Sequence, residues 1–109
     1  MSEHLTFYKF QRRNEDRCVE VFHPINAWSI PLWTLAACGE LGELANLVKK
    51  IHRGDFTYIE SRQDIADEIG DVIAYLSLLA SRCGLDLESC VKEKFNRVSQ
   101  RYNASTRLE

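Results

Sequence analysis

The sequence predicts an all-α fold, a four-helix bundle-like single domain over residues 1–109. Three observations predict it. Apolar residues recur every three or four positions in four stretches, which is the period of an amphipathic helix. No stretch alternates apolar and polar residues as a half-buried strand does. The prolines and two of the five glycines fall at the breaks between the four stretches, where such residues interrupt helices.

The first two expected helices are joined by a proline-containing loop. The first covers about residues 5–22 and ends before Pro24, because the residue that precedes a proline is pushed out of the α region. The second begins near Pro31, which fits a first helical turn, and Gly54 supplies its C-cap. Their apolar stripes are Phe7, Phe10, Cys18, Val21 and Phe22 in the first, and Leu32, Leu35, Ala36, Leu44, Leu47, Val48 and Ile51 in the second.

The third and fourth expected helices are separated by Gly84. Ser61 or Asp64 is expected to cap the third helix, and Asp86 the fourth, because these side chains accept hydrogen bonds from free backbone N–H groups. The chain from Asn103 onward is expected to fray. The stripes are Ile65, Ile69, Val72, Leu76, Leu79 and Cys83 in the third helix, and Val91, Phe95, Val98 and Tyr102 in the fourth.

Composition and charge exclude several classes of protein. A net charge of −2 with a pI near 5.9 gives no electrostatic basis for binding a nucleic-acid duplex or an anionic membrane. Residues 1–10 lack the apolar core of a signal peptide, and no apolar run is long enough to span a membrane. The four cysteines lack the spacing of a zinc site. We therefore expect a cytoplasmic protein whose cysteines are reduced thiols, three of them acting as small apolar residues within helices.

Two pairs of acidic residues stand out in the second and third expected helices. Glu40 and Glu43 are the only charged residues in 36–45, and Glu68 and Asp71 repeat their spacing. Residues three apart share a helix face, so antiparallel neighbouring helices would bring four carboxylates to one point. Ionised carboxylates removed from water are costly unless they are paired or bound to metal. Ligands that are all oxygen favour a hard cation such as Mg²⁺ or Mn²⁺.

Two glycines beside the first acidic pair strengthen this interpretation. Gly39 and Gly42 each cost the helix roughly 1 kcal/mol relative to alanine, whereas small residues let a neighbouring helix or a ligand approach closely. The alternative is that the acids lie on a solvated face; two such pairs on adjacent helices favour the metal. A di-iron bundle would require Glu-x-x-His on two helices, and neither pair has a histidine at that position.

The order of these residues resembles the MazG-like all-α nucleoside triphosphate pyrophosphohydrolases. The hallmark of that family is Glu-x-x-Glu followed by Glu-x-x-Asp, which here occupies residues 40–43 and 68–71 with a spacer of 24 residues. Segments 39–46, 49–50, 64–72 and 94–99 also read like the family. The resemblance covers about residues 28–102, which would form the core of the domain.

The resemblance implies a metal-dependent hydrolase. Glu40, Glu43, Glu68 and Asp71 would be both the catalytic residues and the ligands of Mg²⁺ or Mn²⁺, with the triphosphate of a (deoxy)nucleotide substrate bound to the metal. Water would attack the α-phosphorus in line, giving the monophosphate and pyrophosphate. One carboxylate would orient that water or accept its proton. Which acid does so, the number of metal ions and the base preference stay open.

The resemblance also suggests residues that contact the rest of the nucleotide. Each has a plainer alternative, a solvated basic face for the polar residues and the core for the tryptophans. Tyr75, one turn after Asp71, would either reach a phosphate or pack. The candidates are Lys50, Lys94, Asn96 and Arg101 for the phosphates, and Trp28 and Trp33 for the base.

Two other functions fit the same sequence. A helical interaction module would bind a nucleotide or a protein without turnover, although the complete set of four acids together with Lys94 argues against it. Hydrolysis of phosphoribosyl-ATP would use the same fold. Small size and the family resemblance predict a homodimer or homotetramer, with removal of unwanted nucleotides from the cellular pool as its role.

Overall fold

The structure is a computed structural model that describes residues 4–109, and every regular element in that range is helical. The all-α class predicted from the sequence is therefore confirmed, with four α-helices. None of them combines the length and the apolarity that crossing a membrane would require. In chain order the elements are α1 (Phe7–Val21), the 3₁₀ turn η1 (Ile25–Ala27), α2 (Ile30–His52), α3 (Tyr58–Arg82) and α4 (Leu87–Arg101).

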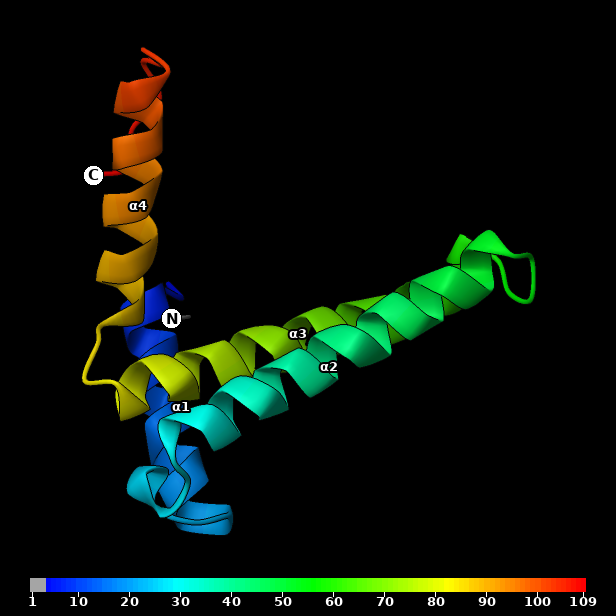
Figure 1. The fold of residues 1–109 in the computed structure, drawn as a ribbon, viewed down its shortest axis with the longest axis horizontal. Coiled ribbons are helices and arrows are strands. Elements are labelled where there is room, and N and C mark those ends of the chain that lie inside the picture. The colour runs from blue at the N-terminus through cyan, green and yellow to red at the C-terminus, as the bar shows by residue number, and fades with distance from the viewer. Residues whose placement is uncertain (1–3) are drawn as a thin grey trace.

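The two long helices form a hairpin that carries the rest of the fold (Figure 1). α2 and α3 run side by side along their length, and α1 and η1 pack on α3 at the base of the hairpin. α4 packs on α1 and on the last part of α3, and it points away from the hairpin. One chain is thus L-shaped, with the hairpin as one arm and α1 with α4 as the other.

The helix ends follow local hydrogen-bond chemistry. α3 begins earlier than predicted, because Thr57 is its N-cap in a capping box: the Thr57 hydroxyl accepts from the backbone N–H of Glu60, whose carboxylate accepts from that of Thr57. The expectation that Ser61 or Asp64 caps α3 is wrong. The predicted cap of α4 is confirmed, because the Asp86 carboxylate accepts from the backbone N–H of Ser89 at 2.9 Å.

Two glycines terminate the long helices. Gly54 and Gly84 have φ angles of +94° and +71°, the left-handed region that glycine enters without steric cost. Gly39 and Gly42 serve a different purpose, because they lie within α2. No atom of the described chain outside their own helix backbone comes within 4 Å of the place where a Cβ would stand at either glycine. The close approach expected there is therefore not made by a helix of the same chain.

The core lies at the base of the hairpin. Trp33, Cys18 and Leu78 are almost completely buried and pack together, so each of the three helices α1, α2 and α3 contributes one residue. The predicted core face of α1 is wrong in part. Its buried residues are Gln11, Asn14 and Cys18, whereas Phe22 is 70% exposed. Two polar amides therefore take the place of large apolar side chains.

The hydrogen bonds of Gln11 explain why this polar residue is buried. Its side chain is fully buried, and its Nε2 donates to Ser81 Oγ at 3.0 Å and to the Leu85 carbonyl at 2.9 Å. Its Oε1 accepts from the backbone N–H of Leu87 at 2.8 Å. Gln11 thus ties α1 to the end of α3, to the connection and to the first residue of α4.

The segment after α4 was expected to fray, but it does not. It is tied to α4 by Asn96, whose Nδ2 donates to the Leu108 carbonyl and whose Oδ1 accepts from the Leu108 N–H, both at 2.8 Å. The cysteines are free thiols, as expected, but only Cys18 is buried. The apolar role predicted for cysteines within helices therefore holds for that one residue.

Candidate functional site

Three carboxylates meet halfway along the hairpin. Glu40 comes from α2, and Glu68 and Asp71 come from one face of α3, where residues three apart are neighbours. Each side chain offers one oxygen, and these three oxygens lie within 4.8 Å of one another. We call this group the acidic cluster. The convergence that the sequence predicted for antiparallel neighbours is what the structure shows for these three acids.

The fourth predicted acid lies beside the acidic cluster. Glu43 is exposed and contributes no oxygen to the group of three. It is nevertheless close enough to act electrostatically on Glu40 and on Glu68. Glu43 therefore adds negative charge to the cluster from its outer side.

The protein environment makes the acids costly to ionise. Burial, and then the negative charge of Glu43 and Asp71, raises the pKa of the Glu40 carboxyl above its ordinary value. The same causes in the same order raise the pKa of Glu68. The Oε2 atom of Glu68 is also buried and has no hydrogen-bond partner among the described residues. A buried carboxylate oxygen without a partner, next to two further carboxylates, fits a hard divalent cation.

This arrangement predicts how pH and magnesium affect stability. The folded protein keeps protons on Glu40 and Glu68 at pH values where the unfolded chain has lost them. The protonated form of these two acids therefore contributes fully to stability below their ordinary pKa of 4.5, and this contribution is lost as pH rises through their raised pKa values. A cation bound to the ionised acids would remove that cost. We expect Mg²⁺ to raise the melting temperature more at about pH 7 than at about pH 5. Thermal unfolding at both pH values, with Mg²⁺ and with EDTA, measures this; an equal effect at both would contradict it.

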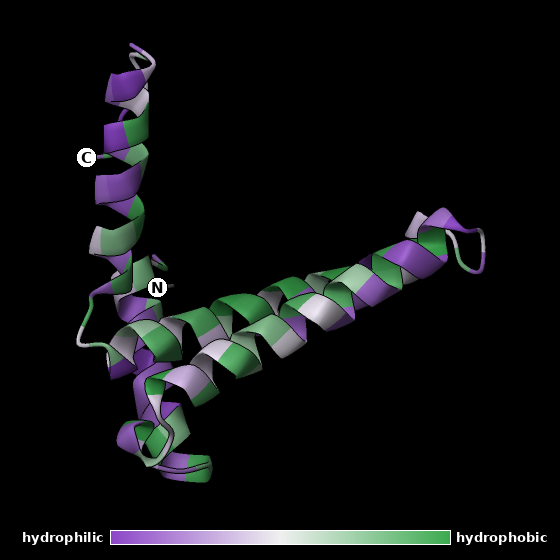
Figure 2. Ribbon diagram, viewed as in Figure 1, coloured by the Kyte–Doolittle hydropathy of each residue, from purple (hydrophilic) through white to green (hydrophobic). Residues whose placement is uncertain are grey.

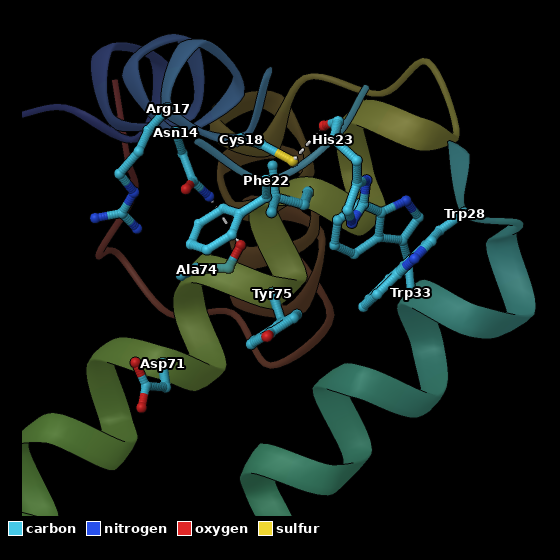
Figure 3. A pocket seen from close by; sticks show the side chains of 11 residues that line it. Asn14, Arg17, Cys18, Phe22, His23, Trp28, Trp33, Asp71, Ala74 and Tyr75 are labelled. Carbon is cyan, nitrogen blue, oxygen red and sulfur yellow. Dashed lines mark hydrogen bonds between the residues drawn. The ribbon is translucent and has the colours of Figure 1, made fainter. Parts of the chain in front are cut away.

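An aromatic cleft of about 290 Å³ opens beside the acidic cluster, with Asp71 in its wall (Figure 3). Trp28 and Trp33 form one side, with ring centroids 4.6 Å apart. Trp33 is fixed in the core, because its indole N–H donates to the Ile25 carbonyl at 2.9 Å, whereas Trp28 is only partly buried. Both candidate base-binding residues thus line one cleft, Trp33 as a rigid wall and Trp28 as the more accessible ring.

Tyr75 links the aromatic cleft to the acidic cluster. Its ring centroid lies 6.3 Å from that of Trp33, and its hydroxyl feels the charges of Glu40 and Asp71. Burial, and then those two charges, raises the pKa of the Tyr75 phenol. The hydroxyl therefore stays protonated at neutral pH and is a hydrogen-bond donor at the border between cleft and cluster.

One side of the aromatic cleft was missed from the sequence, because it comes from α1 and the turn that follows. Its charged and polar members are Arg17, His23 and Asn14. Asn14 lies in the middle of the predicted apolar stripe of α1. A polar residue at a buried position of an amphipathic helix is the signal that would have identified Asn14. The lining residues from this part of the chain are Asn14, Arg17, Cys18, Phe22 and His23.

A second, polar cleft of about 300 Å³ lies on the other side of the acidic cluster, toward the tip of the hairpin. Of the predicted phosphate-binding residues, Lys50 lines this cleft, and Asn46 is an amide that the sequence interpretation did not single out. Its other lining residues are Glu43, Leu47, Phe56, Asp64, Asp67 and Glu68. The acidic cluster thus separates an aromatic cleft from one that contains a lysine.

The three candidates on α4 are not brought to the acidic cluster. Within the described residues, α4 packs on α1 and α3 and does not reach α2. The Asn96 amide is occupied by Leu108 on both of its polar atoms. Lys94 and Arg101 are exposed on the arm that points away from the hairpin. Within one chain, therefore, Lys50 is the predicted phosphate-binding residue that lies near the acids.

The hairpin, its carboxylates and the comparison with known sequences define the class of the protein. The profile of the MazG-like family matches residues 39–109, which include the acidic cluster, and the chain belongs to that family. It is 37% identical over 70 residues to the gene 37 protein of Mycobacterium phage L5, which covers 62% of this chain and 61% of the phage protein.

Two mammalian proteins are also similar. Over 72 residues the chain is 38% identical to dCTP pyrophosphatase 1 of Mus musculus and to that of Rattus norvegicus, covering 62% of this chain and 42% of each relative. The chain thus aligns with about two fifths to three fifths of the length of the relatives that it matches. No solved structure matches the chain significantly.

Proposed function

We propose that the chain hydrolyses a nucleoside triphosphate to the monophosphate and pyrophosphate, with a divalent cation at the acidic cluster. The observation that carries this proposal is the order of three features along the hairpin. The order, from the end of the hairpin that carries the core to its tip, is an aromatic cleft, three converging carboxylates and a polar cleft with Lys50. A base, an α-phosphate and a pyrophosphate follow one another in the same order in the substrate. The relatives named dCTP pyrophosphatase 1 support the same reaction class.

In the proposed complex the base meets the aromatic cleft, and the pyrophosphate meets a polar cleft whose four carboxylates require a divalent cation beside Lys50. Trp28, which is partly exposed, offers an aromatic face for the base, with the buried Trp33 packed behind it, and the protonated hydroxyl of Tyr75 donates to the α-phosphate. Lys50 in the polar cleft would neutralise charge on the departing pyrophosphate. Lys94 and Arg101 remain proposed phosphate contacts that would reach a cluster only in an assembly of several copies, because α4 does not approach α2 within one described chain.

The acidic cluster has the donor set for Mg²⁺ or Mn²⁺. Glu40, Glu68 and Asp71 would hold the cation, and the buried Oε2 of Glu68 without a partner is the oxygen most in need of one. A cation bound there supplies charge neutralisation for the phosphates and makes a bound water molecule more acidic. We propose that Glu43, exposed and beside the cluster, orients the attacking water or accepts its proton.

The reaction is tested by measuring pyrophosphate and monophosphate release from a panel of ribo- and deoxynucleoside triphosphates, with Mg²⁺ and with EDTA. We expect both products in equal amounts in Mg²⁺ and none in EDTA. Phosphate release instead of pyrophosphate would exclude the proposed bond cleavage. Folded protein without turnover of any nucleotide would favour a binding module. Turnover of phosphoribosyl-ATP alone would identify the protein as a phosphoribosyl-ATP hydrolase, the other enzyme considered above.

We further propose that the chain self-associates, as a homodimer or homotetramer in the cytoplasm. Apolar residues lie along both helices of the hairpin (Figure 2), and Leu35, Leu41 and Ile69 are each at least half exposed. Large apolar side chains exposed on a long helical hairpin favour burial against another chain. Light scattering should give two or four times the chain mass of 12.6 kDa. A monomeric mass at micromolar concentration would contradict the proposal.

A further inference from the structure

The Trp28 ring is carried by a turn rather than by a helix. Trp28 follows η1 with an extended backbone, φ −108° and ψ 142°, and Ser29 then caps α2. The ring lines the aromatic cleft and packs on Trp33 and His23, with ring centroids 4.6 and 4.7 Å away (Figure 3). Aromatic pairs of this kind accept several relative orientations. The position of the Trp28 ring therefore depends on what holds its backbone.

A side chain from the end of α3 holds that backbone. Arg82 is the last residue of α3 and is half-buried. Its Nε donates to the Trp28 carbonyl at 2.9 Å, across 54 positions of the sequence. No other group in residues 4–109 donates to this carbonyl. Because a guanidinium donor forms a stronger hydrogen bond than a neutral one, this bond fixes the turn to the end of α3.

The contribution of Arg82 to a bound base would pass through Trp28, because Arg82 does not itself line the aromatic cleft. Trp33 needs no such support, since it lies in α2 and its indole N–H donates to the Ile25 carbonyl at 2.9 Å. Without the bond from Arg82 the turn could shift, and the Trp28 ring would move relative to the fixed Trp33. A ligand that stacks on Trp28 would then have to order the turn as it binds, which lowers its affinity.

We propose that Arg82 is a positioning residue of the base site: through the Trp28 carbonyl it holds the Trp28 ring where a base can stack on it. The inference rests on the proposed use of the aromatic cleft for the base of a nucleotide. It adds a residue from outside that cleft, at the opposite end of α3 from the residues that line the polar cleft.

The chain allows an isosteric test of this hydrogen bond. In Arg82→Gln the side-chain Nε2 is separated from Cβ by the same number of bonds as Nε of arginine, so a donor is kept and the charge is lost. Arg82→Met has a similar length without a donor, and Arg82→Lys keeps the charge but has a methylene in place of Nε. We expect Arg82→Met and Arg82→Lys to bind dCMP about tenfold more weakly than the unmodified chain, by titration calorimetry. Arg82→Gln should bind it within about threefold of the unmodified chain.

Two readouts separate positioning from a general loss of stability. The tryptophans of the chain are Trp28 and Trp33, and indoles this close couple to give a paired signal in circular dichroism. That signal should weaken in Arg82→Met without any ligand and persist in Arg82→Gln. Affinity for pyrophosphate with Mg²⁺, which the proposed function assigns to the polar cleft, should change in neither variant. Arg53→Met is the control: it removes an exposed arginine that pairs with Asp55 and lines neither cleft, and it should alter neither readout nor dCMP affinity.

A double-mutant cycle tests whether Arg82 acts through Trp28. Trp28→Ala should itself weaken the binding of dCMP, because the stacking surface is lost. In that background Arg82→Met should cause no further loss, since the ring that Arg82 positions is already absent.

The outcomes separate this inference from the proposed reaction. Unchanged dCMP affinity in Arg82→Met and Arg82→Lys, or an equal loss in Arg82→Gln, would overturn the role of the hydrogen bond. A loss that remains in the Trp28→Ala background would overturn the path through Trp28. If Arg82→Met does not fold, the comparison of Arg82→Lys with Arg82→Gln decides the question.

The expected pattern of dCMP affinities would support the inference even if no triphosphate is hydrolysed, in which case the proposed reaction alone fails. Pyrophosphate release together with dCMP affinity that Trp28→Ala leaves unchanged would leave the reaction standing and overturn the inference. Failure of the unmodified chain to bind dCMP would overturn the cleft as the base site, and the role of Arg82 with it.

Discussion

Asp71→Asn is expected to fold normally and to lose about a hundredfold to a thousandfold in turnover, the range observed when one charge-stabilising group is removed from an active site. Asp71 is the residue at which the acidic cluster and the aromatic cleft meet. The amide keeps the size of the side chain but removes the negative charge that attracts a cation. Affinity for Mg²⁺ should fall together with activity. Pyrophosphate release and Mg²⁺ titration followed by calorimetry measure the two losses separately.

Two comparisons sharpen this experiment. Asp16→Asn changes an exposed aspartate on α1 that lines neither cleft, and it should behave like the unmodified protein. Glu43→Gln should also fold and lose activity and metal affinity, which tests the acid that lies beside the group of three. Wild-type turnover in Asp71→Asn would remove that residue from the site. Loss of activity with unchanged Mg²⁺ affinity would assign Asp71 to substrate binding instead.

Gln11→Leu is expected to destabilise the fold by about 2–6 kcal/mol, because two backbone groups would lose their partner and each buried polar group left without one costs roughly 1–3 kcal/mol. Leucine is similar in size, so little packing volume is lost. The Leu85 carbonyl and the Leu87 N–H would both lose the partner that Gln11 provides. A loss of that size is a large fraction of the stability of a typical domain. Urea denaturation should show a lower midpoint with an unchanged slope.

An exposed glutamine provides the control for Gln11. Gln100→Leu, on the surface of α4, should change the free energy of unfolding by no more than about 0.5 kcal/mol, as is usual for surface positions. If both variants had the same small effect, the buried hydrogen bonds of Gln11 would not be what fixes α1 to the end of α3. A lower slope for Gln11→Leu would indicate that α1 detaches before the hairpin unfolds.

The sequence predicted the parts of this structure that depend on neighbours along the chain. The four helices follow from apolar spacing, and the Asp86 cap and the stop at Gly84 follow from local chemistry. The early start of α3 could also be predicted from neighbouring residues, since Thr57 and Glu60 have the spacing of a capping box. It was missed because the apolar stripe begins only at Ile65, so the first turns of α3 carry no periodic signal.

The α1 side of the site depends on contacts that sequence spacing does not reveal. Gln11 bonds to residues 70 or more positions away, and Asn14 bonds to Ala74. Such amides are expected at the surface when only the spacing of apolar residues is considered, because most amides are exposed. The acids of α2 and α3 were easier to place, since consecutive helices joined by a short loop are normally neighbours. The position of α4 was not predicted, because it is set by packing on α1, a helix that is far from α4 in the sequence.

The open glycines within α2 lead us to expect that a bound ligand lengthens the lifetime of this protein. Gly39 and Gly42 weaken the helix around Glu40, and nothing in the described chain uses the space that they leave. With like charges gathered at the same level, a cation bound in the middle of the hairpin would stabilise it. Chains without a ligand would be unfolded more often, and in a cell unfolded chains are removed by proteases. The amount of protein would then rise and fall with the supply of any ligand that stabilises it, without any dedicated control of its synthesis.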